Sequence, residues 1–150
     1  MECALVTRLP SGSQWVYEIK LDGFRAIAVK SGPVKLFSRR RKLFSQYPHI
    51  VEAIEAIPNG TVLDGEIVAL DDEGRPNFNL LQHSRTETSR VCYFVFDLLV
   101  YQNRDLTGLP LTKRCALLKK VLQPSQRVRI LDQFEVSAAD IVAAVRQQGF

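Results

Sequence analysis

One hexad of the sequence combines residue types that could carry out nucleophilic chemistry: Lys20-Leu21-Asp22-Gly23-Phe24-Arg25. A lysine amine attacks only after losing its proton, and an ordinary lysine, with a pKa near 10.4, is deprotonated to about one part in a thousand at neutral pH. Nearby cations and partial burial both lower that pKa, and Arg25 and Arg39 are the cations that the sequence offers. The hexad therefore predicts that Lys20 is a nucleophile, with a surface lysine in a hairpin as the alternative.

Four cations stand side by side in Arg39-Arg40-Arg41-Lys42. The net charge of +4 is modest, so this local concentration says more about partners than the total does. Such a run attracts phosphate groups, including those of a nucleic-acid backbone. A solvated basic turn is the alternative that the sequence leaves open.

The elements that must position these residues follow one another with short turns between them. Residues 15–20 alternate bulky and polar side chains, and Asp22-Gly23 marks a turn before Phe24–Lys30 resumes the alternation, which predicts a hairpin with Lys20 near its tip. Many hairpin-linked strands with interspersed helices predict an α+β domain built on antiparallel sheet. The remaining patterns predict strands at 34–38, in two pieces around Asp64-Gly65 within 61–70, at 91–101 (buried on both faces) and at 128–134, and helices at 47–57, 77–84, 112–122 (capped by Thr112) and 137–149.

The hexad and four later segments resemble the nucleotidyltransferase motifs shared by ATP-dependent DNA ligases, RNA ligases and mRNA-capping enzymes. Residues 9–18 and 104–114 are more similar to the bacterial end-joining type of DNA ligase than to a capping enzyme. The resemblance covers essentially the whole chain and implies the α+β nucleotidyltransferase (ATP-grasp-like) fold, with antiparallel sheets flanked by helices, and a role in DNA repair and recombination. The four segments are Ser38-Arg39, Leu63-Asp64-Gly65-Glu66-Ile67-Val68-Ala69, Phe78-Asn79-Leu80-Leu81-Gln82-His83 and Tyr93-Phe94-Val95-Phe96-Asp97-Leu98-Leu99.

The resemblance also implies a role for single residues at the nucleotide. Lys20 would attack the α-phosphorus of ATP, release pyrophosphate and keep AMP through a phosphoramide bond. Glu66 would contact the ribose or help to hold Mg²⁺ or Mn²⁺, Phe96 would stack on the adenine, and Glu18 would lie beside the adenine pocket. Of Phe94 and Phe96, we expect only one to face the adenine, on the premise that the two point to opposite faces of their strand.

Cationic residues are implied at the phosphates and at nucleic acid. Arg25 and Arg39 would contact the sugar and phosphates of the nucleotide and later of a nicked double-stranded DNA. Asp22 and Gly23 are expected to form a turn, with the glycine permitting a close approach of two backbones. Sequence-independent attraction to the DNA backbone would come from Arg39, Arg40, Arg41 and Lys42.

Composition excludes several classes of protein. The 46% apolar and 24% charged content is that of a globular chain, and 150 residues suffice for one folded domain. No run approaches the roughly 18 apolar residues of a membrane span, and no leader pattern opens the sequence, so we expect a cytoplasmic protein that binds no membrane. The cysteines Cys3, Cys92 and Cys115 form no close pair, which predicts reduced, mostly buried thiols rather than a disulfide framework or a zinc site.

The resemblance implies further parts beyond Phe150: a glutamate motif that binds metal, a strand with two lysines that hold the α-phosphate, and an OB-fold domain. We therefore expect residues 1–150 to be a partial adenylation domain, C-terminally incomplete and without the OB-fold domain. Alone, it should be inactive or weakly active and should self-associate through an exposed sheet edge. Two other functions stay open: a related nucleotidyltransferase that acts on RNA or caps with GTP, and a nucleotide- or nucleic-acid-binding module without a full catalytic cycle.

Overall fold

The computed structural model describes residues 5–83 and 90–147. The chain divides into two compact units. The larger one, here called the sheet unit, comprises Leu21–Leu131. The smaller one, here called the terminal unit, combines Met1–Lys20 with Asp132–Phe150.

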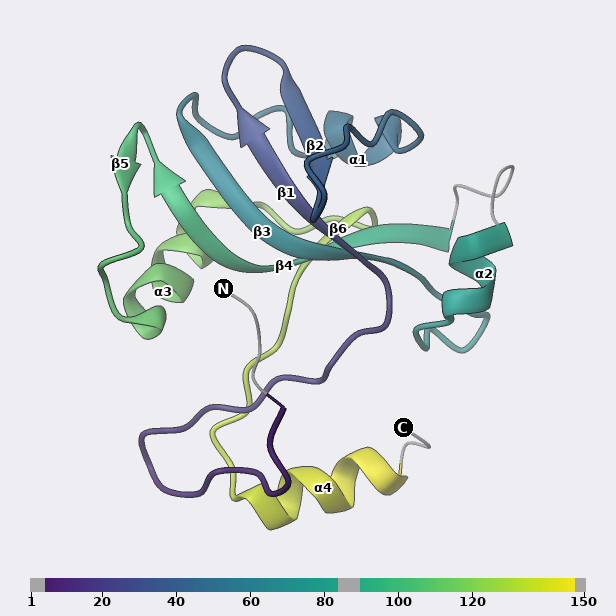
Figure 1. Cartoon of the computed structure of the whole chain (residues 1–150), viewed down its shortest axis with the longest axis vertical. Helices are drawn as coiled ribbons and strands as arrows, with labels where there is room; N and C mark the ends of the chain where they lie inside the picture. The colour runs from purple at the N-terminus through teal and green to yellow at the C-terminus, as the bar shows by residue number, and fades with distance from the viewer. Residues whose placement is uncertain (1–4, 84–89, 148–150) are drawn as a thin grey trace. The chain divides into compact units, whose positions relative to one another are not determined.

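The sheet unit is built on six strands in the order β2-β1-β3-β4-β5, with β6 paired to β4 (Figure 1). Every pairing is antiparallel except that of β4 with β6, which is parallel. The predicted α+β class is confirmed, with one parallel pair that the sequence did not indicate. The strands are β1 (Phe24–Lys30), β2 (Val34–Ser38), β3 (Thr61–Ala69), β4 (Val91–Tyr101), β5 (Arg104–Asp105) and β6 (Val128–Ile130).

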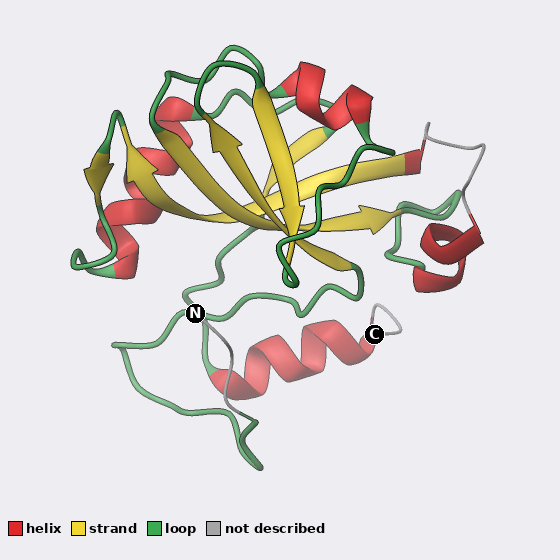
Figure 2. Ribbon diagram, turned by 45° about the horizontal axis from the view of Figure 1, so that its top comes forward, coloured by secondary structure: helices red, strands yellow, loops and turns green. Residues whose placement is uncertain are grey.

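Three helices accompany this sheet (Figure 2): α1 (Pro48–Ala53), α2 (Phe78–His83) and α3 (Leu111–Val121). One face of the sheet forms the main core with them, because alternate residues of each strand point to the same face. Burying one such aliphatic side chain is worth about 1.5–3 kcal/mol, so this face holds the sheet unit together. Its fully buried members include Ala26, Ala28, Leu36, Ile50, Leu63, Ile67, Tyr93, Val95, Leu98, Leu118 and Leu122.

Strand β4, like β1 and β2, has the bounds predicted from the sequence. It covers Val91–Tyr101, the predicted range. Its first three residues are all buried, and since neighbours on a strand point to opposite faces, both faces are covered there. Tyr93 belongs to the main core, whereas Cys92 belongs to a second, smaller cluster with Val68 and Leu70.

The predicted hairpin between residues 15–20 and β1 is wrong. Strand β1 pairs with β2 on one edge and with β3 on the other along nearly its whole length, so neither edge is left for another strand. Of the predicted strand only Tyr17 makes a bridge, and its partner is Phe134. The predicted range 61–70 contains one strand, Thr61–Ala69, rather than two pieces, with irregularities in its register to β4 at Val62/Leu63 and Asp64/Gly65.

The helix predictions hold in their centres and fail at some ends. Helix α1 is shorter than the predicted 47–57 and begins with Pro48, whose missing N–H costs nothing in a first turn. Thr112 does not cap α3, because Pro110 occupies that position and no side chain makes a cap hydrogen bond. The terminal unit contains α4 (Ala138–Gln147), and there the Ser137 Oγ accepts the backbone N–H of Asp140 at 3.1 Å, as the predicted start requires. The predicted helix ends at Ser84 and Gly149 lie outside the described residues.

The expectations about the cysteines and about a membrane span can be compared with the described residues. Cys92 and Cys115 are buried thiols outside any disulfide, as predicted, and Cys3 lies outside the described residues. No helix in the described ranges has the length and apolarity needed to cross a membrane. The cytoplasmic location, the self-association through a sheet edge and the assignment of 1–150 as a partial adenylation domain stay predictions.

Candidate active site

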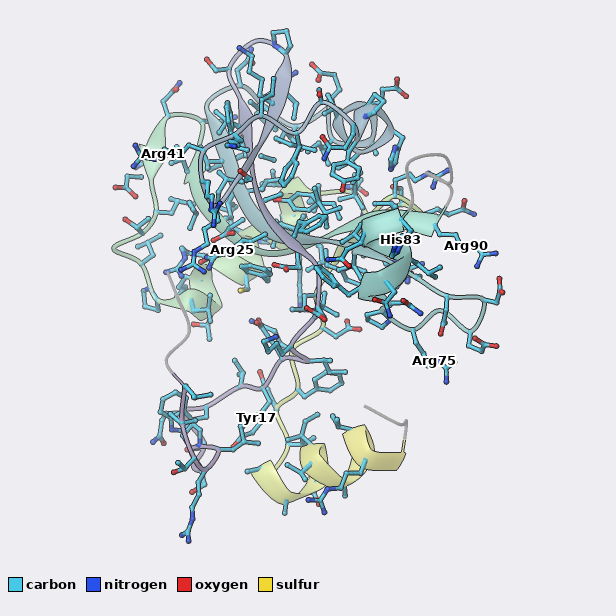
Figure 3. The ribbon with its side chains drawn as sticks, turned by 45° about the vertical axis from the view of Figure 1, so that its right-hand side comes forward. Tyr17, Arg25, Arg41, Arg75, His83 and Arg90 are labelled. Atoms are coloured by element: carbon cyan, nitrogen blue, oxygen red, sulfur yellow. The ribbon has the colours of Figure 1, made fainter. Side chains whose placement is uncertain are left out.

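The sheet face opposite the main core carries three of the predicted site residues, Arg25, Glu66 and Phe96. Arg25 of β1 lies opposite Glu66 of β3, and Glu66 lies opposite Phe94 of β4. Cross-strand partners point to the same side of a sheet, so these three side chains form a row on one face. All three are half-buried. Below, this surface is called the site face, and Figure 3 labels Arg25 on it.

A carboxylate that the sequence reasoning missed holds Arg25 in place. The Arg25 Nε and Nη2 donate to the two carboxylate oxygens of Asp64 at 3.0 and 2.6 Å. Asp64 is only 2% exposed, so this fork-to-fork pair is shielded from water on the side of the acid. The guanidinium also lies 5.7 Å from the centre of the Phe96 ring. Asp64 stands inside the Asp-Gly-Glu segment, and a buried strand carboxylate that needs a cation was the signal that could have identified it.

The expectation that Phe94 and Phe96 point to opposite faces is wrong. Residues two apart on a strand share a face, and only immediate neighbours alternate. Both rings are half-buried on the site face, each beside a guanidinium: Phe96 beside Arg25, and Phe94 with Arg129 5.6 Å from its centre. The two rings differ in surroundings, because Phe94 also packs against the cluster of Val68, Leu70 and Cys92.

Two motif glycines allow close packing, Gly23 beside Glu66 and Gly65 against the Tyr93 ring of the main core. A Cβ on Gly23 would clash with the backbone carbonyl oxygen of Ile67 and meet the Glu66 side chain at 3.0 Å. A Cβ on Gly65 would meet the Tyr93 ring at 2.6 Å. The predicted close approach at Gly23 is confirmed, and it brings the end of the hexad against β3 beside Glu66. The turn expected at Asp22-Gly23 is not formed, since Gly23 lacks a positive φ and no hairpin follows.

Lys20 and Glu18 belong to the terminal unit. Lys20 is exposed and is the last residue of that unit before the chain enters the sheet unit. Glu18 accepts a hydrogen bond from the Gln133 side-chain amide at 2.9 Å. Tyr17, labelled in Figure 3, exchanges two backbone hydrogen bonds with Phe134, at 3.1 and 2.9 Å. These contacts tie the segment just before Lys20 to the segment after β6, and the nucleophilic role of Lys20 stays a prediction.

The basic run forms a tight turn at the end of β2. The Ser38 N–H donates to the Lys42 carbonyl at 2.8 Å, and the Arg41 N–H donates to the Ser38 carbonyl at 2.8 Å. Arg41, labelled in Figure 3, takes a positive φ of 58°, which reverses the chain. All four cationic residues, Arg39, Arg40, Arg41 and Lys42, are exposed. The structure thus contains the basic turn, and its binding to DNA stays a prediction.

A metal ion would find few protein ligands at the site face. Among residues 5–83 and 90–147, no three His, Cys, Asp or Glu side chains are grouped so as to hold a metal. Mg²⁺ commonly takes one or two carboxylates and completes its shell with water and substrate phosphates. Glu66 lies half-buried on this face, opposite Arg25, and its role in holding a metal ion stays a prediction.

Solved structures with this fold come from DNA and RNA ligases. The ligase domain of LigD from M. tuberculosis superposes with a TM-score of 0.74 and 28% identity, over 89% of this chain and 45% of that one. A mycobacterial DNA ligase D in complex with ATP and MES gives 0.72 and 28%, over 89% and 44%. Archaeal ATP-dependent RNA ligase, at 18% identity and a TM-score of 0.57, shares the fold alone.

Sequence relatives agree with the structural ones. The multifunctional non-homologous end joining protein LigD of Pseudomonas aeruginosa is 35% identical over 127 residues, which are 81% of this chain and 15% of that protein. A probable DNA ligase of Beutenbergia cavernae is 34% identical over 158 aligned positions, 97% of this chain and 31% of that protein. The chain thus spans less than a third of either relative. The family model of the ATP-dependent DNA ligase domain matches residues 4–149, and the chain belongs to that family.

Proposed function

We propose that this chain is the part of an ATP-dependent DNA ligase that accepts AMP on Lys20 for the sealing of nicked DNA. The observation that carries the proposal is that Arg25, Glu66 and Phe96 lie on one sheet face. Arg25 belongs to the same hexad as Lys20. A cation binds phosphates, and a carboxylate binds a ribose or a metal ion. An apolar ring stacks on a base.

The proposed reaction is a displacement at phosphorus. The deprotonated Nζ of Lys20 attacks the α-phosphorus of ATP, a P–N bond forms, and the P–O bond to pyrophosphate breaks. Arg25 is held by Asp64 at 3.0 and 2.6 Å, so its fork is oriented before the nucleotide arrives. Glu66 would hold Mg²⁺ or Mn²⁺, which supplies neutralisation of the phosphate charge when bound.

The test is covalent labelling. The chain is incubated with Mg²⁺ and either α-labelled ATP or α-labelled GTP and is then separated by denaturing electrophoresis. We expect label from ATP that acid releases and alkali spares, as for a phosphoramide. Labelling by GTP at least as strong as by ATP would support the RNA- or cap-type alternative. Reversible ATP binding without any covalent label would support the binding-module alternative.

Phe96→Ala is expected to weaken ATP binding by about 1–3 kcal/mol, the value of one base–aromatic stack. Phe94→Ala is the matched control, since it removes the same ring two residues away. It should cost less affinity, because part of that ring is engaged by Val68, Leu70, Cys92 and Arg129. Calorimetry on variants of equal folding stability measures both losses. Equal losses would mean that both rings contact the base.

Replacing Arg40 and Arg41 together by glutamine is expected to weaken binding to a nicked duplex. Binding weakens as salt rises, and a plot of the logarithm of the DNA-binding constant against the logarithm of the salt concentration has a negative slope. Each lost phosphate contact should make this slope less steep by about 0.9, because fewer counterions are released. Fluorescence anisotropy between low and moderate salt measures the slope. The control is the double replacement of Lys119 and Lys120, two exposed lysines of α3, which should change the slope less. Identical slopes for the two double variants would contradict a DNA-binding role for the turn.

A further inference from the structure

Phe96 is an extra residue in the ladder between β3 and β4. Asp64 pairs with Asp97 and Gly65 pairs with Val95, so two steps on β4 correspond to one step on β3. The residue between them, Phe96, has no partner in that ladder. Such a β-bulge redirects a side chain and leaves its backbone without the usual ladder bonds, so its conformation must be fixed by other contacts.

Those contacts come from helix α3. The Arg114 Nε and Nη2 donate to the two carboxylate oxygens of Asp97 at 2.7 and 2.8 Å. Arg114 is 6% exposed and Asp97 is 5% exposed, so the pair lies inside the protein. The same carboxylate accepts the N–H of Leu98 at 2.8 Å, and the Cys115 thiol lies 3.6 Å from the carbonyl oxygen of Phe96.

The Phe96 ring faces the proposed nucleotide site. It lies beside the Arg25 guanidinium, which Asp64 fixes with two hydrogen bonds. The bulge is thus flanked by two bidentate ion pairs, Arg25–Asp64 between β1 and β3 and Arg114–Asp97 between α3 and β4. Removing the pair with α3 leaves the backbone at Phe96 free to return towards a regular pleat, and this changes the direction of the ring.

We propose that Arg114 is a positioning residue for nucleotide binding: through Asp97 it fixes the β4 bulge, and the bulge aims Phe96 at the purine base. This inference rests on the proposed function, in which Phe96 stacks on the adenine. Arg114 touches neither base nor phosphate in this scheme and acts only through the ring. Its loss should therefore weaken ligands that carry the base and spare ligands that consist of phosphates alone.

A double-mutant cycle in the 150-residue chain tests this, with ATP, AMP and inorganic tripolyphosphate as probes and calorimetry as the readout. The variants are Arg114→Lys, which keeps the charge but loses the fork, Phe96→Ala, and both together. We expect Arg114→Lys to raise the Kd of ATP and of AMP by about fivefold or more, within the range of coupled neighbouring residues. The same change in the Phe96→Ala chain should raise either Kd by less than about twofold, and tripolyphosphate should bind equally to all four chains.

The control is Leu118→Val, which loosens the same helix in the main core without touching Asp97. It should leave the Kd of ATP unchanged at matched folding stability. If Arg114→Lys does not fold, Asp97→Asn takes its place in the cycle, because the amide keeps one acceptor for the guanidinium.

The inference is overturned if Arg114→Lys weakens AMP equally with and without Phe96, or if Leu118→Val weakens AMP as much. Both outcomes are read from reversible binding, so they are distinct from failure of the covalent step. A parent chain that binds AMP and ATP but never takes up label would overturn the proposed adenylation alone. A parent chain that binds neither nucleotide would overturn both.

Discussion

Lys20→Ala is expected to reduce covalent labelling by α-labelled ATP from the weak level of the parent chain to background, because loss of a covalent nucleophile commonly costs more than about a thousandfold in rate. The alanine has no amine to form the P–N bond, whereas the groups on the site face remain in place. Lys20 is exposed, so its removal should change the free energy of unfolding by less than about 0.5 kcal/mol. Denaturing electrophoresis with parallel urea unfolding separates the chemical loss from a folding loss.

Lys35→Ala is the matched control for this experiment. Lys35 is also exposed, lies in β2 of the sheet unit and stands outside the hexad. It should label as the parent chain does. Lys20→Arg adds a second comparison, because it keeps the positive charge but replaces the amine by a guanidinium that stays protonated. If Lys20→Ala labels as well as the parent, AMP is attached to another residue and the assignment is wrong.

Arg114→Leu is expected to destabilise the chain by about 3–5 kcal/mol, the usual cost of removing one partner of a buried ion pair. The reason is that the Asp97 carboxyl, 5% exposed, would be left buried without its bidentate partner. The hydrogen bond to Asp97 raises the pKa of Arg114 above the usual arginine value, so the guanidinium is charged in the parent. A domain is commonly stable by 5–15 kcal/mol, so this loss is a large share of the total. The urea midpoint measures it.

Arg75→Leu supplies the comparison, because Arg75 also pairs with an acid, Asp71, at 3.0 Å but is 55% exposed. An exposed pair contributes about 0–1 kcal/mol, so its loss should be small. Replacing Arg114 and Asp97 together by leucine should recover part of the loss, since no unpaired charge then remains. Similar losses for Arg75→Leu and Arg114→Leu would show that burial of the Arg114 pair contributes nothing.

Local patterns in the sequence determined several parts of this protein. The continuous apolar run of β4 and the alternation in β1 and β2 predicted strands that the structure contains. The resemblance of the motifs to the ligase family also predicted residues that meet, since Arg25, Glu66 and Phe96 do share one sheet face. The strand predictions succeeded because side-chain alternation depends on neighbours within a few positions.

Strand pairing was decided only by the tertiary structure. Residues 15–20 have a strand pattern, yet β2 and β3 occupy both edges of β1, so the expected hairpin could not form. The parallel pairing of β6 with β4 and the extra residue at Phe96 are likewise properties of the assembled sheet. The register between two strands depends on which of their faces are buried together. The sequence of one segment alone therefore does not determine which strand it pairs with.

The two ion pairs beside the site could not be predicted from the sequence either. Arg25 and Asp64 are 39 positions apart, and Asp97 and Arg114 are 17 apart. No local pattern predicted these pairings, because charged side chains are mostly exposed and need no protein partner there. Asp64 and Asp97 are buried because the strands that contain them lie inside the protein. A buried charge is stable only beside a partner, and the tertiary structure determines which residue that partner is. The sequence by itself thus determined which groups could act on a nucleotide, and the packing of distant segments decided how those groups are held.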